Sequence, residues 1–229
     1  MPENNTIWVV IPAYNEAPTL SGVLEDLGIY PYRVVVVDDG STDGTTQVAL
    51  NYPVVILRHL TNLGQGASLQ TGITYALNQP GTKYIVTFDA DGQHQASDVQ
   101  RMLASLQTGG VDIALGSRFI KTGRALHISK VRWLALKIAV WLTRLTTGLK
   151  ITDTHNGLRV MTATAAARIK IEQNGMAHAS EILSQVADLK LSYCEVPVTV
   201  TYSAYSRLKG QSLSNSINII WDLLMGKLR

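Results

Sequence analysis

Five short runs rich in Val and Ile, separated by stretches with helical periodicity, constrain the fold of this chain most strongly. The runs occupy residues 7–11, 34–37, 54–57, 84–88 and 112–116. The helical stretches cover about 17–27, 44–51, 66–78 and 97–106. Near-continuous apolar runs indicate strands buried on both faces. Strands that alternate with helices predict an α/β fold, in which helices cover both faces of a mostly parallel central sheet.

The pattern changes after Gly116. We expect a basic loop at 117–130, a helix at 131–147, a second loop at 151–159, helices at 163–170 and 177–189, and a strand at 191–200. No repeat or linker divides the chain, and 229 residues suffice for one substantial core. We therefore predict a single domain over residues 1–229, with a first half at 1–116 and a second half at 117–229.

Composition excludes several classes of protein. A hydrophobic content of 46% with 16% charged residues is typical of a globular chain. The single cysteine, Cys194, cannot form an internal disulfide, which fits a reducing cytoplasm. We expect neither a secretory signal nor a membrane-spanning helix, because no run approaches about 20 apolar residues without charges. The net charge of +3 favours anionic partners, but no basic run with interleaved aromatic residues predicts a nucleic-acid surface.

Two carboxylates, Asp89 and Asp91, end the apolar run at 84–88 and are followed by Gly92. Side chains at positions i and i+2 of a strand share a face, so both carboxylates can point to one place beyond the end of the strand. Two like charges so close repel each other unless a cation lies between them. Mg²⁺ commonly binds through one or two carboxylates together with substrate phosphates. The alternative is a plain polar turn, in which Asp and Gly are ordinary residues.

Two further polar clusters follow strands of the predicted sheet, at residues 12–16 and 38–44. Ligands of such sheets bind beyond the carboxyl ends of the strands. Tyr14 offers a flat face for stacking, and Glu16 or Asp39 can accept hydrogen bonds from a base or a ribose. By itself the second cluster could equally form a turn and a helix cap. Three clusters at the ends of strands favour one shared crevice.

In these motifs the chain resembles the inverting glycosyltransferases of family 2, which have the GT-A fold. The similarity is greatest to the dolichol-phosphate mannose synthases and the bacterial polyprenyl-phosphate sugar transferases. It covers nearly the whole chain through motifs at 11–16, 37–45, 62–66, 89–94, 116–119, 153–159, 181–183 and 205–212. Each motif is weak alone, but their order and spacing together are specific. The resemblance implies a Rossmann-like half that binds a nucleotide sugar and a half that binds the acceptor.

The resemblance also implies roles for individual residues. Residues matching those that bind the nucleotide sugar are Pro12, Ala13, Tyr14, Glu16, Asp39, Asp89, Ala90 and Asp91. Asp89 and Asp91 match the Asp-x-Asp motif that binds Mg²⁺ or Mn²⁺, with Gln93 as a third ligand. Arg118, Arg132 and Arg207 match basic residues that contact the acceptor phosphate or the leaving group, which makes Asp91, Arg118 and Arg207 the expected catalytic residues. Asp153 and Glu181 match acidic positions near the sugar.

Three positions depart from the family pattern. Gln65 stands where the family often has Lys or Arg, Gln95-Ala96 replace a usual pair of prolines, and Asn156 replaces a common Ser. None of the three removes the expected metal site. Together they leave the nucleotide open between UDP and GDP.

The remaining possible reactions differ in the chemical nature of the acceptor. A hydroxyl acceptor needs a general base, whereas a lipid phosphate is already ionised and needs cations instead. The basic residues after position 116 suit a phosphate, although they could equally form a solvated loop. They are Arg118, Lys121, Arg124, Lys130 and Arg132. Two amphipathic helices with Trp, at 130–145 and 213–228, could lie on a membrane surface or pack on the core.

We therefore expect a metal-dependent, inverting transferase that moves a sugar from a GDP- or UDP-linked donor to a polyprenyl phosphate. It would act peripherally at the cytoplasmic face of a membrane. Transfer to a sugar hydroxyl, with Glu181 or Asp153 as the base, is the alternative within enzymes. A nucleotide-sugar-binding module without turnover is the alternative outside them. A nucleotidyltransferase is disfavoured, because residues 12–16 replace the Gly-rich basic loop that such enzymes carry after the first strand.

Overall fold

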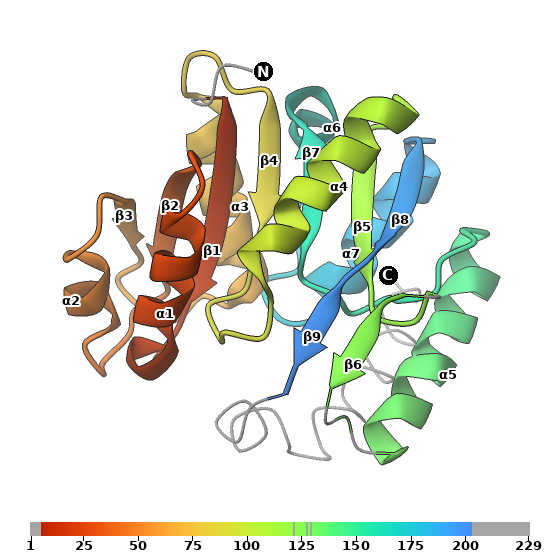
Figure 1. The fold of residues 1–229 in the computed structure, drawn as a ribbon, viewed down its shortest axis with the longest axis horizontal. Coiled ribbons are helices and arrows are strands. Elements are labelled where there is room, and N and C mark those ends of the chain that lie inside the picture. The colour runs from red at the N-terminus through yellow and green to blue at the C-terminus, as the bar shows by residue number, and fades with distance from the viewer. Residues whose placement is uncertain (1–5, 121, 127, 129, 203–229) are drawn as a thin grey trace.

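The computed structural model describes residues 6–120, 122–126, 128 and 130–202 (Figure 1). Arg207, the side chain of Arg132 and the expected helix at 213–228 lie outside the described part of the chain. Among the described residues, no helix combines the length and the apolar character needed to cross a bilayer.

A seven-stranded sheet forms the centre of the protein, in the order β3-β2-β1-β4-β7-β5-β8 (Figure 1). All neighbouring strands are parallel except β7, which runs antiparallel to β4 and β5. The strands are β1 (Ile7–Ala13), β2 (Arg33–Asp38), β3 (Val55–Arg58), β4 (Tyr84–Thr87), β5 (Ile113–Ser117), β7 (Arg159–Thr162) and β8 (Tyr193–Pro197). A separate parallel pair joins β6 (Arg124–Leu126) to β9 (Thr199–Thr201).

Helices cover both faces of the sheet, because side chains alternate between two apolar layers along the central strands. Val9 and Ile11 of β1 pack in one layer with α1 and α4, whereas Trp8 and Val10 pack in the other with α3, α6 and α7. The helices are α1 (Ala17–Gly28), α2 (Thr45–Ala49), α3 (Gln65–Leu77), α4 (Ala96–Gly109), α5 (Lys130–Thr147), α6 (Ala163–Arg168) and α7 (His178–Asp188). The result is a three-layer α/β/α sandwich, as the sequence predicts.

The expected strands and helices of the first half are confirmed, with small shifts at their ends. Three expectations differ from the structure. The strand β3 lies at the edge of the sheet and is only partly buried, so the prediction of strands buried on both faces is wrong there. The expected loop at 117–130 contains β6, and the expected strand at 191–200 is divided into β8 and β9, which belong to different sheets. The sequence analysis also missed β7, which pairs with both β4 and β5.

Candidate active site

A cavity of about 570 Å³ opens beyond the carboxyl ends of β1 and β4, a volume typical of ligand sites. Because β2, β1 and β4 are neighbours in the sheet, the three polar clusters lie side by side, as expected. All the predicted nucleotide-sugar and metal residues line this cavity, together with Arg118. They are Pro12, Ala13, Tyr14, Glu16, Asp39, Asp89, Ala90, Asp91 and Gln93.

Hydrogen bonds join the loops that follow β1 and β2. The Ser41 hydroxyl accepts from the backbone N–H of Asn15 at 2.9 Å, and the Asn15 side chain accepts from the N–H of Thr42 at 2.9 Å. The Thr45 hydroxyl accepts from the N–H of Glu16 at 2.9 Å. The Asp-Gly-Ser stretch is therefore a turn, as one alternative held, and it also fixes the loop that carries Tyr14 and Glu16.

Asp39 is buried and supports a third loop at the edge of the cavity. Its carboxylate accepts from the backbone N–H groups of Leu63 at 2.9 Å and Gly64 at 2.7 Å, and it contacts His59 Nδ1 at 2.7 Å. These contacts hold the segment that leads into α3. Asp39 lines the cavity with oxygens that already have partners, so its contact with a base or ribose stays a prediction.

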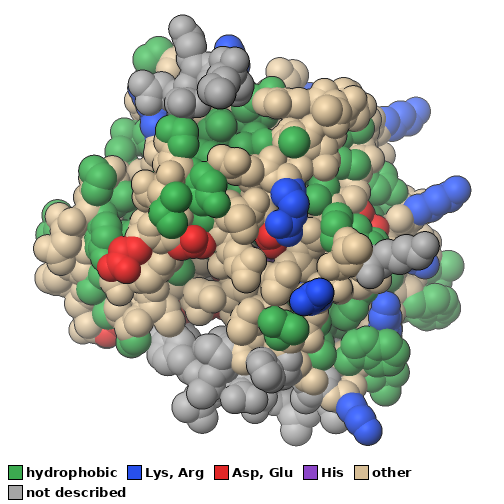
Figure 2. Space-filling view, viewed as in Figure 1, with side chains coloured by type: hydrophobic (Ala, Val, Ile, Leu, Met, Phe, Trp, Pro, Cys, Tyr) green, Lys and Arg blue, Asp and Glu red, His purple; other side chains and the backbone are tan. Residues whose placement is uncertain are grey.

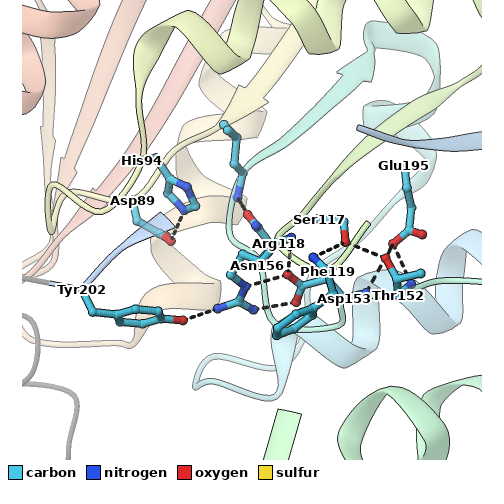
Figure 3. A network of polar contacts seen from close by, with 11 residues as sticks. Asp89, His94, Ser117, Arg118, Phe119, Thr152, Asp153, Asn156, Glu195 and Tyr202 are labelled. Atoms are coloured by element: carbon cyan, nitrogen blue, oxygen red, sulfur yellow. Dashed lines mark hydrogen bonds and ion pairs between the residues drawn. The ribbon is translucent and has the colours of Figure 1, made fainter. Parts of the chain in front are cut away.

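The Asp89 carboxylate is held from two sides. Gln65 Nε2 donates to Oδ1 at 3.0 Å. On the other side, His94 Nε2 contacts Oδ2 at 3.2 Å (Figure 3). A Cβ atom at Gly157 would lie 2.1 Å from Asp89 Oδ2, so only glycine fits beside this carboxylate. Gln65, one of the departures from the family pattern, therefore orients a predicted metal ligand.

The Asp91 carboxylate is held by Gln93, its predicted partner in metal binding. The backbone N–H of Gln93 donates to Asp91 Oδ1 at 3.0 Å, and Nε2 donates to Oδ2 at 2.6 Å. Because Nε2 is the atom that donates, the amide oxygen of Gln93 is left as a further possible ligand atom next to Asp91. The described residues contain no cluster of three or more His, Cys, Asp or Glu side chains suited to a metal.

The two carboxylates differ in their pKa. Burial and the negative charge of Asp89 raise the pKa of Asp91 to about 6. Burial also opposes ionisation of Asp89, but the hydrogen bond and charge of His94 outweigh it and lower the pKa of that carboxyl. A buried Asp91 carboxylate that the nearby Asp89 repels, with the side chain of Gln93 beside it, fits a hard divalent cation that would share a diphosphate.

Arg118 forms a buried ion pair at the end of β5 (Figure 3). Its Nε and Nη2 atoms donate to the two oxygens of Asp153 at 2.6 and 2.5 Å, and Nη1 donates to the Tyr202 hydroxyl at 2.6 Å. Burial opposes ionisation of Asp153, but the charge of Arg118 outweighs it and lowers the pKa of Asp153. Arg118 is one of the residues that line the cavity, yet its three guanidinium nitrogens all donate to Asp153 or Tyr202, so its charge is balanced within the protein.

The two acidic residues considered as general bases do not line the cavity. Asp153 is committed to Arg118. Glu181, on α7, accepts from the backbone N–H of Glu172 at 3.0 Å and of Gln173 at 3.0 Å. Both carboxylates therefore have structural partners.

Four basic residues that line the cavity received no role from the sequence: His94, His155, Arg159 and His178. Burial lowers the pKa of His155 and of His178 to about 4 and that of Arg159 to about 10. Arg159 is the last residue of the family motif at 153–159, and this was the only signal in the sequence that could have identified it. Its position opposite Thr87 depends on the strand β7, which was not expected from the sequence.

An apolar strip on α5 remains exposed, so packing on the core does not account for the side chains of this strip. Leu134, Ile138, Trp141 and Leu145 are exposed, and Trp133 beside them is 46% exposed. Lys137 Nζ lies 5.6 Å from the centre of the Trp133 ring. Figure 2 shows hydrophobic side chains and several Lys and Arg side chains together at the right-hand edge, over α5.

The sequence was compared with known protein families and with known proteins. The model of glycosyl transferase family 2 matches residues 8–173. An uncharacterized protein of Methanocaldococcus jannaschii is 35% identical over 97% of this chain and 92% of its own length. The UDP-N-acetylglucosamine–dolichyl-phosphate N-acetylglucosaminyltransferase of Methanococcus voltae is 27% identical over 97% of this chain and 96% of its own.

A similar fold is seen in glucosyl-3-phosphoglycerate synthase of Mycobacterium tuberculosis, with a TM-score of 0.73 and 19% identity. The match covers 96% of this chain and 80% of the synthase. Another structure of that synthase contains Mn²⁺, UDP and glucosyl-3-phosphoglycerate.

Proposed function

The chain belongs to glycosyl transferase family 2 and has the GT-A fold, and on this basis we propose that it transfers a sugar from a nucleotide diphosphate to a polyprenyl phosphate. The transfer inverts the anomeric centre in one displacement. The acceptor oxygen bonds to the anomeric carbon as the bond from that carbon to the diphosphate breaks, and the bonding electron pair leaves with the diphosphate.

The donor occupies the crevice at the ends of β1, β2 and β4. Tyr14, 42% exposed, stacks on the base, and Glu16 accepts from the nucleoside. Asp89, Asp91 and Gln93 would hold Mg²⁺ or Mn²⁺, which would neutralise charge on the departing diphosphate. Gln65 and His94 keep Asp89 in place for this task. The synthase crystallised with Mn²⁺ and UDP supports the assignment of this crevice to a nucleotide and a metal.

One observation supports a phosphate acceptor most directly. The two carboxylates considered as the base for a hydroxyl acceptor, Asp153 and Glu181, are bound to other groups and do not line the cavity. A phosphate monoester is already ionised near neutral pH and needs no proton removed. Arg118, which Asp153 holds at the cavity, would orient that phosphate together with Arg132 and Arg207. The dolichyl-phosphate acceptor named for the Methanococcus voltae relative supports the same class of acceptor.

The exposed apolar strip on α5 supports a peripheral membrane position at the cytoplasmic face. A helix with exposed Trp and Leu side chains and flanking Lys residues can lie among lipid headgroups. Trp133, Trp141 and Lys137 provide these features on α5. This arrangement would bring the lipid phosphate to the protein without a membrane span.

A transfer assay tests the proposal. Purified protein is incubated with radiolabelled UDP-glucose, UDP-N-acetylglucosamine or GDP-mannose, with a polyprenyl phosphate in detergent, and with Mn²⁺, Mg²⁺ or EDTA. We expect a lipid-linked sugar from one of these donors, formed with metal and absent with EDTA. Transfer to a free sugar or glycerate hydroxyl, with no product from the lipid phosphate, would favour a hydroxyl acceptor. Binding of a donor without transfer or hydrolysis would favour a binding module.

A further inference from the structure

Buried polar atoms without a partner are concentrated at the cavity. Among the described residues, nine buried side-chain nitrogen or oxygen atoms lack a hydrogen-bond partner within the protein. Five of the nine belong to residues that line the cavity: Ser68, His94, His155, Asn156 and Arg159. Native proteins leave few such atoms unpaired, because each costs free energy, and a cluster of them calls for a specific explanation. A ligand that hydrogen-bonds to them provides one.

Three of these residues lie within one short segment, here named the polar wall: His155, Asn156 and Arg159. The segment passes directly beside the predicted metal ligands. Gly157 adjoins the Asp89 carboxylate, and the Thr87 hydroxyl donates to the Gly157 carbonyl at 2.6 Å. The polar wall is therefore next to the place where the metal and the diphosphate are proposed to bind.

The chemistry of the polar wall differs from that of a phosphate site. Asn156 Oδ1 accepts from the backbone N–H of Leu158 at 3.0 Å, which leaves Nδ2 as the open donor. Arg159 Nη1 is a second open donor. His155 is neutral at physiological pH and can donate or accept at Nδ1, and the hydroxyl of Ser68, which lines the same cavity, can do both. Groups that accept as well as donate suit hydroxyl groups better than a phosphate group, which accepts only.

We propose that the polar wall binds the sugar ring of the donor, with sugar oxygens accepting hydrogen bonds from Asn156 Nδ2 and Arg159 Nη1. This inference rests on the proposed function and specifies the part of the donor that each region binds. The clusters after β1 and β2 hold the nucleoside, and the polar wall selects the sugar. Arg159 and Asn156 are then residues that determine donor specificity.

Calorimetric titration in Mn²⁺ tests the inference by comparing each nucleotide with its sugar conjugate. The pairs are UDP with UDP-glucose, UDP with UDP-N-acetylglucosamine, and GDP with GDP-mannose. Asn156→Asp keeps the acceptor for Leu158 and removes the open donor, whereas Arg159→Lys keeps the charge and removes the guanidinium. The exposed side chains of Asn51 and Arg168 provide matched controls, as Asn51→Asp and Arg168→Lys.

In both test variants we expect about a tenfold or greater loss of affinity for the nucleotide sugar that wild type binds. Affinity for the free nucleotide should change less than about twofold, and the controls should match wild type. With a donor that lacks the contacted hydroxyl, the difference between variant and wild type should disappear. Thermal unfolding identifies a variant that fails to fold, and Asn156→Asp, which keeps its turn, then decides the outcome.

Equal losses for nucleotide and nucleotide sugar, or no loss for either, would contradict the role of the polar wall while leaving the proposed function standing. A wild-type protein that binds none of these nucleotides or sugars would contradict the proposed function itself, and the polar wall with it.

Discussion

Two charged regions of the same cavity are built in opposite ways. At the end of β4, Asp89 and Asp91 place like charges together, and no cationic side chain pairs with Asp91 among the described residues. At the end of β5, Arg118 and Asp153 place opposite charges together and satisfy each other through two hydrogen bonds. We propose that a bound cation completes the first arrangement. The second is satisfied within the protein, because each charge has its partner there.

Asp91→Asn gives the largest expected effect. We expect transfer to fall about 10³-fold or more, because the metal loses a carboxylate and the departing diphosphate loses its counter-charge. The melting temperature should stay unchanged or rise, since one of two repelling charges is removed. Steady-state rates and thermal unfolding check both statements, with the exposed Asp188→Asn as a control. Wild-type rates in Asp91→Asn would contradict the metal assignment.

Asp153→Ala should act on the fold instead. Removing one partner leaves the buried Arg118 charge uncompensated, which costs about 3–5 kcal/mol of unfolding free energy. Chemical denaturation measures this loss, with Asp188→Ala as the control for an exposed carboxylate. A loss below about 1 kcal/mol would mean that Arg118 finds other partners, and the contrast between the two regions would then fail.

Gly157→Ala should disturb the donor region by geometry alone. Its new Cβ would collide with the Asp89 carboxylate, so Asp89 must move away from its contacts with Gln65 and His94. We expect the affinity for Mn²⁺ in the presence of nucleotide to fall about tenfold, with about 1–3 kcal/mol lost in stability. Gly22→Ala, where no atom lies within 4 Å of the added Cβ, is the matched control. Unchanged Mn²⁺ affinity would show that Asp89 is not a ligand.

The smallest expected effect is a difference between the two regions in how metal affinity and stability depend on pH. The pKa of Asp91 is raised to about 6, so its carboxylate is protonated below that pH and ionised above it. Mn²⁺ affinity should therefore fall about tenfold per pH unit below pH 6, as protons compete for the site. The pKa of Asp153 is lowered, so its stabilising contribution is full above the ordinary Asp pKa near 3.8 and is lost only as the pH falls below that value.

Titrations of Mn²⁺ with nucleotide at pH 7, 6 and 5, alongside denaturation at the same pH values, measure these two responses. We expect the affinity for Mn²⁺ to fall between pH 7 and pH 5, whereas the contribution of the Arg118–Asp153 pair to the free energy of unfolding should stay constant. A metal affinity independent of pH would contradict the raised pKa of Asp91.

The position of Asp89 and Asp91 at the edge of the sheet could be predicted from the sequence, because both residues directly follow a strand. Each strand and the carboxylates that follow it are contiguous, and parallel strands bring their ends to one edge. The same is true of Gln93, which is two residues from Asp91. What the sequence could not provide was the order of the strands and the contacts between distant segments.

The region of Arg118 and Asp153 shows what the sequence alone could not predict. Arg118 was expected to contact an acceptor phosphate, but its pairing with Asp153, 35 residues away, depends on tertiary packing. The strand β7 has only four residues and no alternating pattern, and its pairing between β4 and β5 places Arg159 at the cavity. The exposure of the apolar strip on α5 was likewise open, because periodicity gives a face but not what covers it.

The central claim is that Asp89 and Asp91 bind the donor diphosphate through a divalent cation. Calorimetric titration of the wild-type protein with UDP and with GDP, in Mn²⁺ and in EDTA, tests it most directly. We expect one of the two nucleotides to bind at least about tenfold more tightly in Mn²⁺ than in EDTA. Equal affinity of that nucleotide with and without the metal would contradict it.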